Sequence, residues 1–147
     1  MIQIKKISKP QVAEAIAIAY EGDSDILNKY HIRKFNEYEH AVFSTMLLVE
    51  EVSKAEKLSY YKVMYQTRVI GYVIVFQGFL YSFGINIKYR KPTILCDFWK
   101  KIKSILGEKF VSILYENNSR AIDWLKKCGM KEVKQDKETH TVLLTTN

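Results

Sequence analysis

Residues 58–76 carry two extended runs joined by a very short turn. The first run, Leu58–Tyr65, is apolar and aromatic, and the second, VIGYVIVF at Val69–Phe76, follows it after the turn QTR. Two extended runs joined this briefly predict an antiparallel hairpin. Because the second run is apolar on both faces, we expect it to be a central strand of a sheet covered on both sides.

A third extended run follows directly. Gly78 permits a tight turn into FLYSFGINIK, so Phe79–Ile87 is predicted to pair antiparallel with the second run. Alternation along a strand predicts one shared face for Tyr81, Phe83, Ile85 and Ile87. Gly84 interrupts the run, which indicates either a bulge or a close backbone approach at that position.

The other segments complete a mixed order of strands and helices. Ile2–Ile7 alternates like a strand, while Pro92 and Gly107 bracket an apolar helical stripe. The remaining predicted elements are a helix from Ser8 to Tyr20, a helix from Phe35 to Val52, a strand at Lys109–Tyr115, a short helix in NNSRAIDWLKKCG, and strands at MKEV and Thr139–Leu144. The order β-α-α-β-β-β-α-β-α-β-β predicts a single α/β (α+β) domain over residues 1–147, with a mixed sheet and helices on its faces.

The composition and charge of the chain limit the classes of protein to which it can belong. The chain is 48% hydrophobic and 27% charged, which is ordinary for a globular protein, and no apolar run reaches the roughly 20 residues that span a bilayer. The segment MIQIKKISKP has no apolar core of a signal peptide, so we expect cytoplasmic synthesis. The net charge of +7 would suit an anionic partner, but the lysines are spread over helix faces and no nucleic-acid-binding motif is present. Nucleic acid is therefore an unlikely partner.

The cysteines and histidines give little support to redox or metal chemistry. Cys96 and Cys128 form no CxxC pair and fall on apolar helical stripes, which predicts two buried thiols and no disulfide. His31, His40 and His140 are scattered without ligand spacing, so no metal site is expected.

Two motifs resemble a known family. YQTRVIGYVIV is similar to the glycine-bearing hairpin of the GCN5-related N-acetyltransferase (GNAT) superfamily, and NNSRAIDWLKKCGM is similar to its closing helix. Asn118, Ala121 and Gly129 match the pattern N-x-x-A … G-F, with Met130 in place of the aromatic residue. The resemblance covers nearly the whole chain and implies a mostly antiparallel central sheet of about six to seven strands.

The resemblance also implies an acetyl-CoA site. In the family, the pantetheine arm pairs with the fourth strand and the pyrophosphate rests on the start of the next helix. The residues that would hold the cofactor here are Ile85, Ile87, Arg90, Lys91, Thr93 and Asn118. The family pattern R/Q-x-x-G-x-G/A is only partly kept, because Thr93 and Leu95 replace its small residues and Pro92 removes one N–H group. These departures predict a crowded phosphate path.

Proton transfer is the second departure from the family. Leu125 occupies the position of the tyrosine that often serves as the acid, and LYSFGINI lacks the carboxylate that often serves as the base. Tyr115 is the candidate catalytic residue that could substitute, although a structural role for it is the simpler interpretation.

These departures favour a non-catalytic GNAT-fold protein. They resemble those of degenerate GNAT-like proteins encoded by tailed bacteriophages, which implies a structural or interaction role in the virion or in head assembly, with other virion proteins as partners. The alternative is an active acetyl-CoA-dependent N-acetyltransferase that transfers an acetyl group to an amine. A basic nucleic-acid-binding domain is a third hypothesis, which salt-steep binding would identify.

Overall fold

The computed structural model describes residues 1–23 and 38–146, except for the side chains of residues 38–44 and 47. Its elements are β1 (Ile2–Ile7), α1 (Lys9–Tyr20), α3 (Tyr38–Ser53), β2 (Ser59–Tyr65), β3 (Arg68–Phe76), β4 (Phe79–Ile85), a 3-10 turn (Ile87–Tyr89), α4 (Pro92–Leu106), β5 (Val111–Tyr115), α5 (Ser119–Lys127), β6 (Lys131–Asp136) and β7 (Thr141–Thr145). The predicted order is confirmed over these residues. The predicted helix start at Phe35 and the residue His31 lie outside the described residues, as does the side chain of His40.

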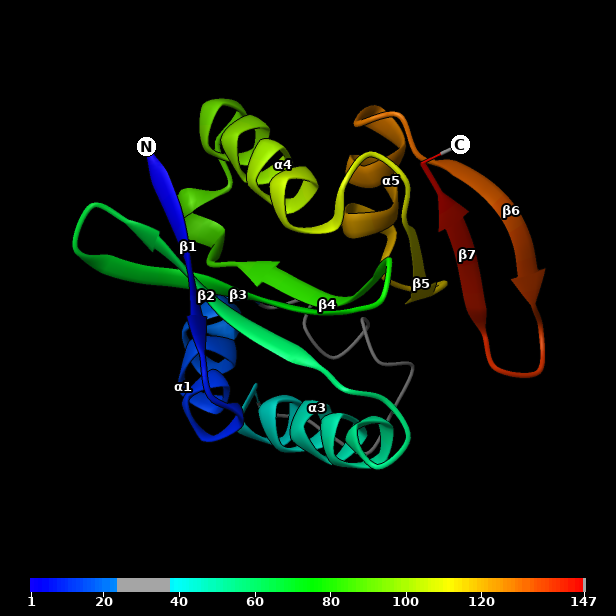
Figure 1. Cartoon of the computed structure of the whole chain (residues 1–147), viewed down its shortest axis with the longest axis horizontal. Coiled ribbons are helices and arrows are strands. Elements are labelled where there is room, and N and C mark those ends of the chain that lie inside the picture. Colours follow the sequence, from blue (N-terminus) through cyan, green and yellow to red (C-terminus); the bar gives the residue numbers. More distant parts are fainter. Residues whose placement is uncertain (24–37, 147) are drawn as a thin grey trace.

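The strands form one seven-stranded sheet in the order β1-β2-β3-β4-β5-β7-β6 (Figure 1). The β4–β5 pair is parallel, and the other neighbouring pairs in this order are antiparallel. This confirms the predicted mixed, mostly antiparallel sheet and the two adjacent hairpins. Strand β3 is buried along most of its length, as its two-sided apolar sequence predicted.

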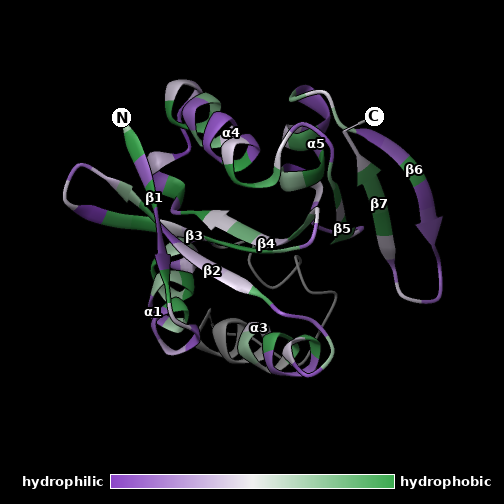
Figure 2. Ribbon diagram, viewed as in Figure 1, coloured by the Kyte–Doolittle hydropathy of each residue, from purple (hydrophilic) through white to green (hydrophobic). Residues whose placement is uncertain are grey.

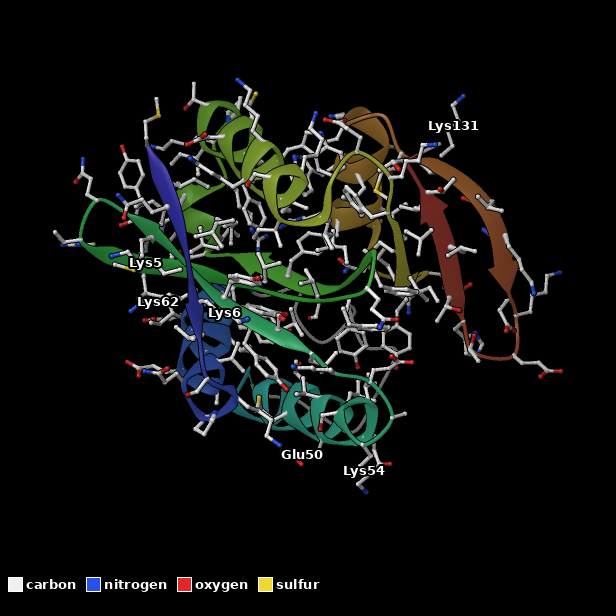
Figure 3. The ribbon with its side chains drawn as sticks, viewed as in Figure 1. Lys5, Lys6, Glu50, Lys54, Lys62 and Lys131 are labelled. Carbon is white, nitrogen blue, oxygen red and sulfur yellow. The ribbon has the colours of Figure 1, made fainter. Side chains whose placement is uncertain are left out.

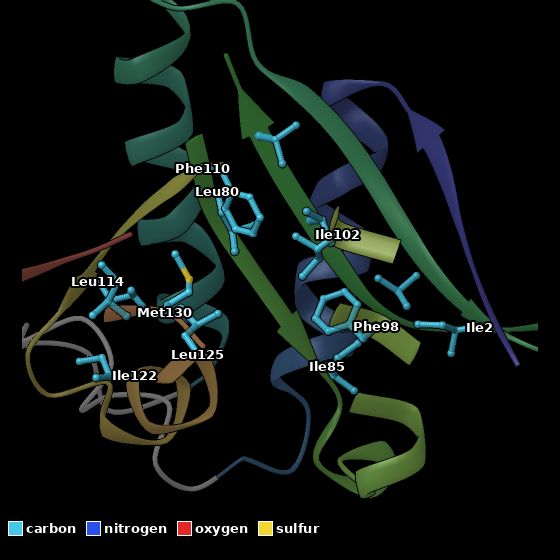
Figure 4. Close-up of a cluster of buried hydrophobic side chains, with 14 of the residues drawn as sticks. Ile2, Leu80, Ile85, Phe98, Ile102, Phe110, Leu114, Ile122, Leu125 and Met130 are labelled. Atoms are coloured by element: carbon cyan, nitrogen blue, oxygen red, sulfur yellow. The ribbon is translucent and has the colours of Figure 1, made fainter. Parts of the chain in front are cut away.

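Helices cover both faces of the sheet, with α1 and α3 on one face and α4 and α5 on the other (Figure 1). The core on the α4–α5 face includes Phe98, Ile102 and Leu125, all fully buried (Figure 4). The core on the other face includes Val12 and Ile16 of α1. The amphipathic pattern is visible along α4, while β6 is hydrophilic beside the hydrophobic β7 (Figure 2). Burial of these two apolar faces is the main stabilising contribution to such a layered fold.

A bulge in β4 changes the face that one aromatic residue presents. Ile74 pairs with Ser82 and Val75 pairs with Leu80, so Tyr81 is an extra residue in β4. Phe83 and Ile85 pack into the α4–α5 core, whereas Tyr81 packs against the opposite core. The prediction that Tyr81 shares a face with Phe83 was therefore wrong, because a bulge shifts the two-residue alternation by one.

Gly84 confirms the predicted close backbone approach. A Cβ atom at this position would lie 3.1 Å from Cε1 of Tyr72 and 3.4 Å from Cβ of Ala19. Gly71 is more tightly restricted, since its Cβ atom would lie 2.1 Å from the carbonyl oxygen of Gly84. The two glycines allow β3 and β4 to meet closely beneath α1.

The two cysteines differ from the prediction of buried thiols. Cys96 is exposed on α4 because it lies two residues from both Ile94 and Phe98, which places it away from the buried stripe. Cys128 is half-buried at the end of α5, and burial is the main cause that raises its pKa to about 11.

Candidate functional site at the split between strands β4 and β5

The parallel strands β4 and β5 pair only at their beginnings. Phe79 pairs with Val111 and Leu80 with Ser112, and the ladder ends there. Strand β5 continues instead as an antiparallel partner of β7. The backbone of β4 from Tyr81 onwards therefore has no β5 partner on that edge, which leaves a split in the sheet.

A cavity of about 440 Å³, called cavity 1 here, lies at this split. Its lining combines the end of β4 with the starts of α4 and α5 and the end of α1. The lining residues are Tyr20, Asp23, Phe83, Gly84, Ile85, Arg90, Leu95, Phe98, Asn117, Asn118, Ser119, Arg120, Ala121 and Trp124. The rings of Phe83, Phe98 and Trp124 lie 5.7 to 6.3 Å apart and form an aromatic wall.

A second cavity of about 280 Å³, cavity 2, adjoins the first. It is bounded by α3, the β3–β4 turn and β5. The lining residues are Thr45, Leu48, Val52, Phe76, Phe79, Tyr81, Ser82, Phe83, Ser112, Ile113, Leu114, Tyr115, Asn118 and Thr141. Phe83 and Asn118 line both cavities, so the cavities meet at the split.

An ion pair lies inside cavity 1. Nη2 of Arg90 is 2.7 Å from Oδ2 of Asp23, whose side chain is only 9% exposed. Nε of Arg90 also donates a hydrogen bond to the carbonyl oxygen of Ile85, at 2.8 Å. Nearby, Nδ2 of Asn86 donates to the carbonyl oxygen of Ile18, at 2.8 Å. These contacts tie the segment after β4 to the end of α1, and they place a guanidinium group on the terminal carbonyl of β4.

A network of hydroxyl groups lies under β4. The hydroxyl of Tyr72 is 2.9 Å from that of Tyr20 and 2.8 Å from Oγ of Ser82. The hydroxyl of Tyr20 is also 3.2 Å from Oγ1 of Thr45. Each is a buried or half-buried polar group that would be costly to leave unpaired. The network fixes the relative positions of α1, α3, β3 and β4 around the split.

Few of the described groups that line the two cavities can transfer a proton. Burial, followed by the neighbouring Tyr115 and Tyr72, raises the pKa of Tyr81 to about 12, so Tyr81 stays protonated at neutral pH. Among the described lining residues, Asp23 is the carboxylate, and it is paired with Arg90. The described part of the chain also shows no cluster of three side chains that could bind a metal ion.

The site residues predicted from the sequence fall in different places in the structure. Ile85, Arg90 and Asn118 line cavity 1, while Tyr115 lines cavity 2 at the end of β5. The other proposed cofactor residues, Ile87, Lys91 and Thr93, are exposed and line neither cavity. Leu125 is 0% exposed and belongs to the α4–α5 core. The family tyrosine position is therefore filled by a core leucine.

Sequence reasoning missed several residues that line cavity 1. Asp23 follows α1, whereas Arg120 and Trp124 both lie on α5, four residues apart. Trp124 offered the clearest signal, since it lies three residues after Ala121 and therefore on the same helix face. Nothing in the sequence indicated that Asp23 would pair with Arg90.

Comparisons with known proteins support the fold. No protein-family model and no curated protein sequence matches the chain. Among solved structures, the chain is similar to an acetyltransferase from Thermus thermophilus, with a TM-score of 0.69 and 9% identity over 99% of this chain and 96% of that one. It is similar to the PaiA N-acetyltransferase of Thermoplasma acidophilum in complex with coenzyme A, with a TM-score of 0.64 and 16% identity over 100% and 99% of the two chains. It is also similar to a probable GNAT-family acetyltransferase from Chromobacterium violaceum, with a TM-score of 0.64 and 12% identity over 98% and 86%. The chain therefore has the fold of the GNAT acetyltransferases.

Proposed function

We propose that the protein is an acyl-CoA-dependent N-acyltransferase, with cavity 1 for the acyl donor and cavity 2 for the acceptor amine. The observation that carries the proposal is the meeting of the two cavities at Phe83 and Asn118. Acyl transfer requires the amine and the acyl carbon to approach within about 3.5 Å in a fixed orientation, and two adjoining cavities allow this. The coenzyme A complex of the Thermoplasma protein agrees with a nucleotide thioester as the donor.

The residues of cavity 1 fit the pantetheine arm of such a donor. The edge of β4 beyond Leu80, which has no strand partner among the described residues, offers backbone groups for amide pairing. The aromatic wall offers apolar contact. Outside the cavity lining, the first turn of α4 leaves the N–H groups of Thr93 and Ile94 without a partner in the helix, whereas Pro92 has no N–H group. Arg90 must move from the Ile85 carbonyl for the arm to pair there. When bound, the cofactor would supply the activated acyl group.

The chain's own residues would mainly position the acceptor. Tyr81, with its pKa of about 12, can donate a hydrogen bond but cannot act as a base at neutral pH. Tyr115 lines the same cavity from β5. No described residue of cavity 2 is a carboxylate or histidine, so none of the described lining residues offers a base for the ammonium proton of the amine.

A second candidate function is a non-catalytic binding role, favoured by the contacts of Arg90. Its guanidinium occupies the β4 carbonyl that a pantetheine arm would use, and Leu125 leaves the family's acid absent from its usual position. The protein would then use its surface for protein contacts. The resemblance to bacteriophage GNAT-like proteins suggests virion or head-assembly proteins as partners.

Binding and turnover of acetyl-CoA distinguish the two functions. A ligand at 100 times its Kd stabilises the native state by about 2.7 kcal/mol, so a donor should raise the melting temperature saturably. The variant Ala121→Phe places a ring in cavity 1 and should abolish the rise, whereas Asp123→Ala, an exposed change on the same helix, should keep it. Acetylated product should be measured by mass spectrometry, since the exposed Cys96 would react with thiol reagents. A wild-type protein with no thermal shift and no product would support the second candidate.

A further inference from the structure

Cavity 2 is aromatic and carries no charge among its described lining residues. Phe76 and Phe79 are stacked with ring centroids 5.0 Å apart, and Tyr81 lies 6.0 Å from Phe76. Ile113 adds an aliphatic side chain that is 43% exposed. The polar groups present, including Ser82 and Thr141, are neutral. Such a lining favours an apolar body with a few hydrogen-bonding atoms.

The same lining disfavours a polycationic acceptor. Each ammonium group that leaves water costs free energy unless it is paired or loses its proton, so a polyamine bears this cost several times and a monoamine once. The described residues of cavity 2 provide no carboxylate to offset it. The electrostatic potential of the whole chain also disfavours a polycation, because the chain carries a net charge of +7 and repels it. Lysines extend from β1, β2 and β6, as Lys5, Lys6, Lys62 and Lys131 show (Figure 3).

The size of cavity 2 limits the acceptor further. Its volume of about 280 Å³ is slightly below the usual range of ligand pockets, about 300–1,000 Å³. Resting on the proposed acyl transfer, we propose that the acceptor is a small primary amine attached to a compact aromatic or aliphatic body. A polyamine, with its several ammonium groups, and a lysine of a protein, whose polar backbone a cavity of this size does not accommodate, are not the substrate class of this cavity.

The test compares three amine probes on the full chain without cofactor: 2-phenylethylamine, spermidine and Nα-acetyl-lysine amide. Ligand-observed NMR titration should give a Kd for 2-phenylethylamine at least about tenfold below that of either other probe, a difference that corresponds to about 1.4 kcal/mol. The variant Ile113→Glu places a carboxylate at the cavity and should move the preference towards spermidine. The matched control Ile113→Gln should not, because it adds similar bulk without charge. Ile113 is partly exposed, so both variants should fold, and their melting temperatures check this.

The outcomes separate this inference from the proposed function. Selective binding of 2-phenylethylamine supports the acceptor class even if acetyl-CoA neither binds nor reacts, in which case only the proposed function fails. Equal or tighter binding of spermidine to the wild-type chain overturns the acceptor class, whatever the turnover. Absence of binding by all three probes also overturns it.

Discussion

Removal of the Tyr72 hydroxyl tests whether the network under β4 holds the split in place. Tyr72→Phe keeps the ring, which is 0% exposed and packs edge-on against Tyr20 with centroids 6.1 Å apart. The change removes the hydrogen bonds to Tyr20 and Ser82. Each neutral hydrogen bond contributes about 1 kcal/mol net, and Ser82 loses a partner while Tyr20 keeps Thr45. We expect a loss of about 1–3 kcal/mol in the free energy of unfolding.

Urea denaturation followed by circular dichroism measures this loss directly. The matched control is Tyr61→Phe on β2, a half-buried tyrosine whose hydroxyl makes no side-chain hydrogen bond to the described residues. The control should change stability by less than about 0.5 kcal/mol. A Tyr72→Phe loss equal to that of the control would refute the reasoning, because it would mean that the network adds nothing to the fold.

Three other predictions concern thiol reactivity, pH dependence and the core. Cys96 should react rapidly with a thiol reagent at pH 8, whereas Cys128, with its pKa of about 11, should react slowly, since only roughly one molecule in 10³ carries its thiolate. Cys96→Ser should therefore remove the fast phase of a mass-spectrometric labelling time course. The pKa of Tyr81 is raised from 10.0 to about 12, so its contribution to stability is present below pH 10 and is lost as pH rises from 10 to 12. Tyr81→Phe should reduce the slope of stability against pH in that window, and an unchanged slope would contradict the assignment. Leu125→Ala should destabilise the chain by about 2–5 kcal/mol, and Leu125→Tyr should also destabilise it by overpacking, as thermal unfolding would detect.

The fold could be predicted because its signals are local. The short turns around residues 66–67 and 77–78 and the two-sided apolar strand β3 determined the central hairpins. Pro92 and Gly107 marked the ends of α4, with Pro92 as the first helical residue and Gly107 at positive φ. Each of these features depends on residues within a few positions of one another, which a single sequence displays directly.

The site could be predicted only in part because its contacts are long-range. The pair Arg90–Asp23 joins residues 67 positions apart, and the sequence gives no sign of which acid an arginine will meet. The bulge at Tyr81 depends on the pairing register of β3 and β4. The same register places the side chain of Tyr81 in the lining of cavity 2. Two of the fourth-strand assignments, at Tyr81 and Ile87, therefore failed for a structural reason: the strand bulges at the first and ends before the second.

The split between β4 and β5 is a consequence of topology, whereas its chemistry depends on a few side chains. Strand β5 pairs fully with β7 and only briefly with β4, so a chain with this strand order opens a gap at the ends of the parallel strands. A gap of this kind can persist after catalysis is lost, because the ladders that create it also hold the sheet together. The hydrogen bond from Nε of Arg90 to the Ile85 carbonyl blocks the end of β4, so a donor can pair there only after Arg90 leaves that carbonyl. The guanidinium that is released, which Asp23 holds at 2.7 Å, then becomes available to an anionic group of the donor.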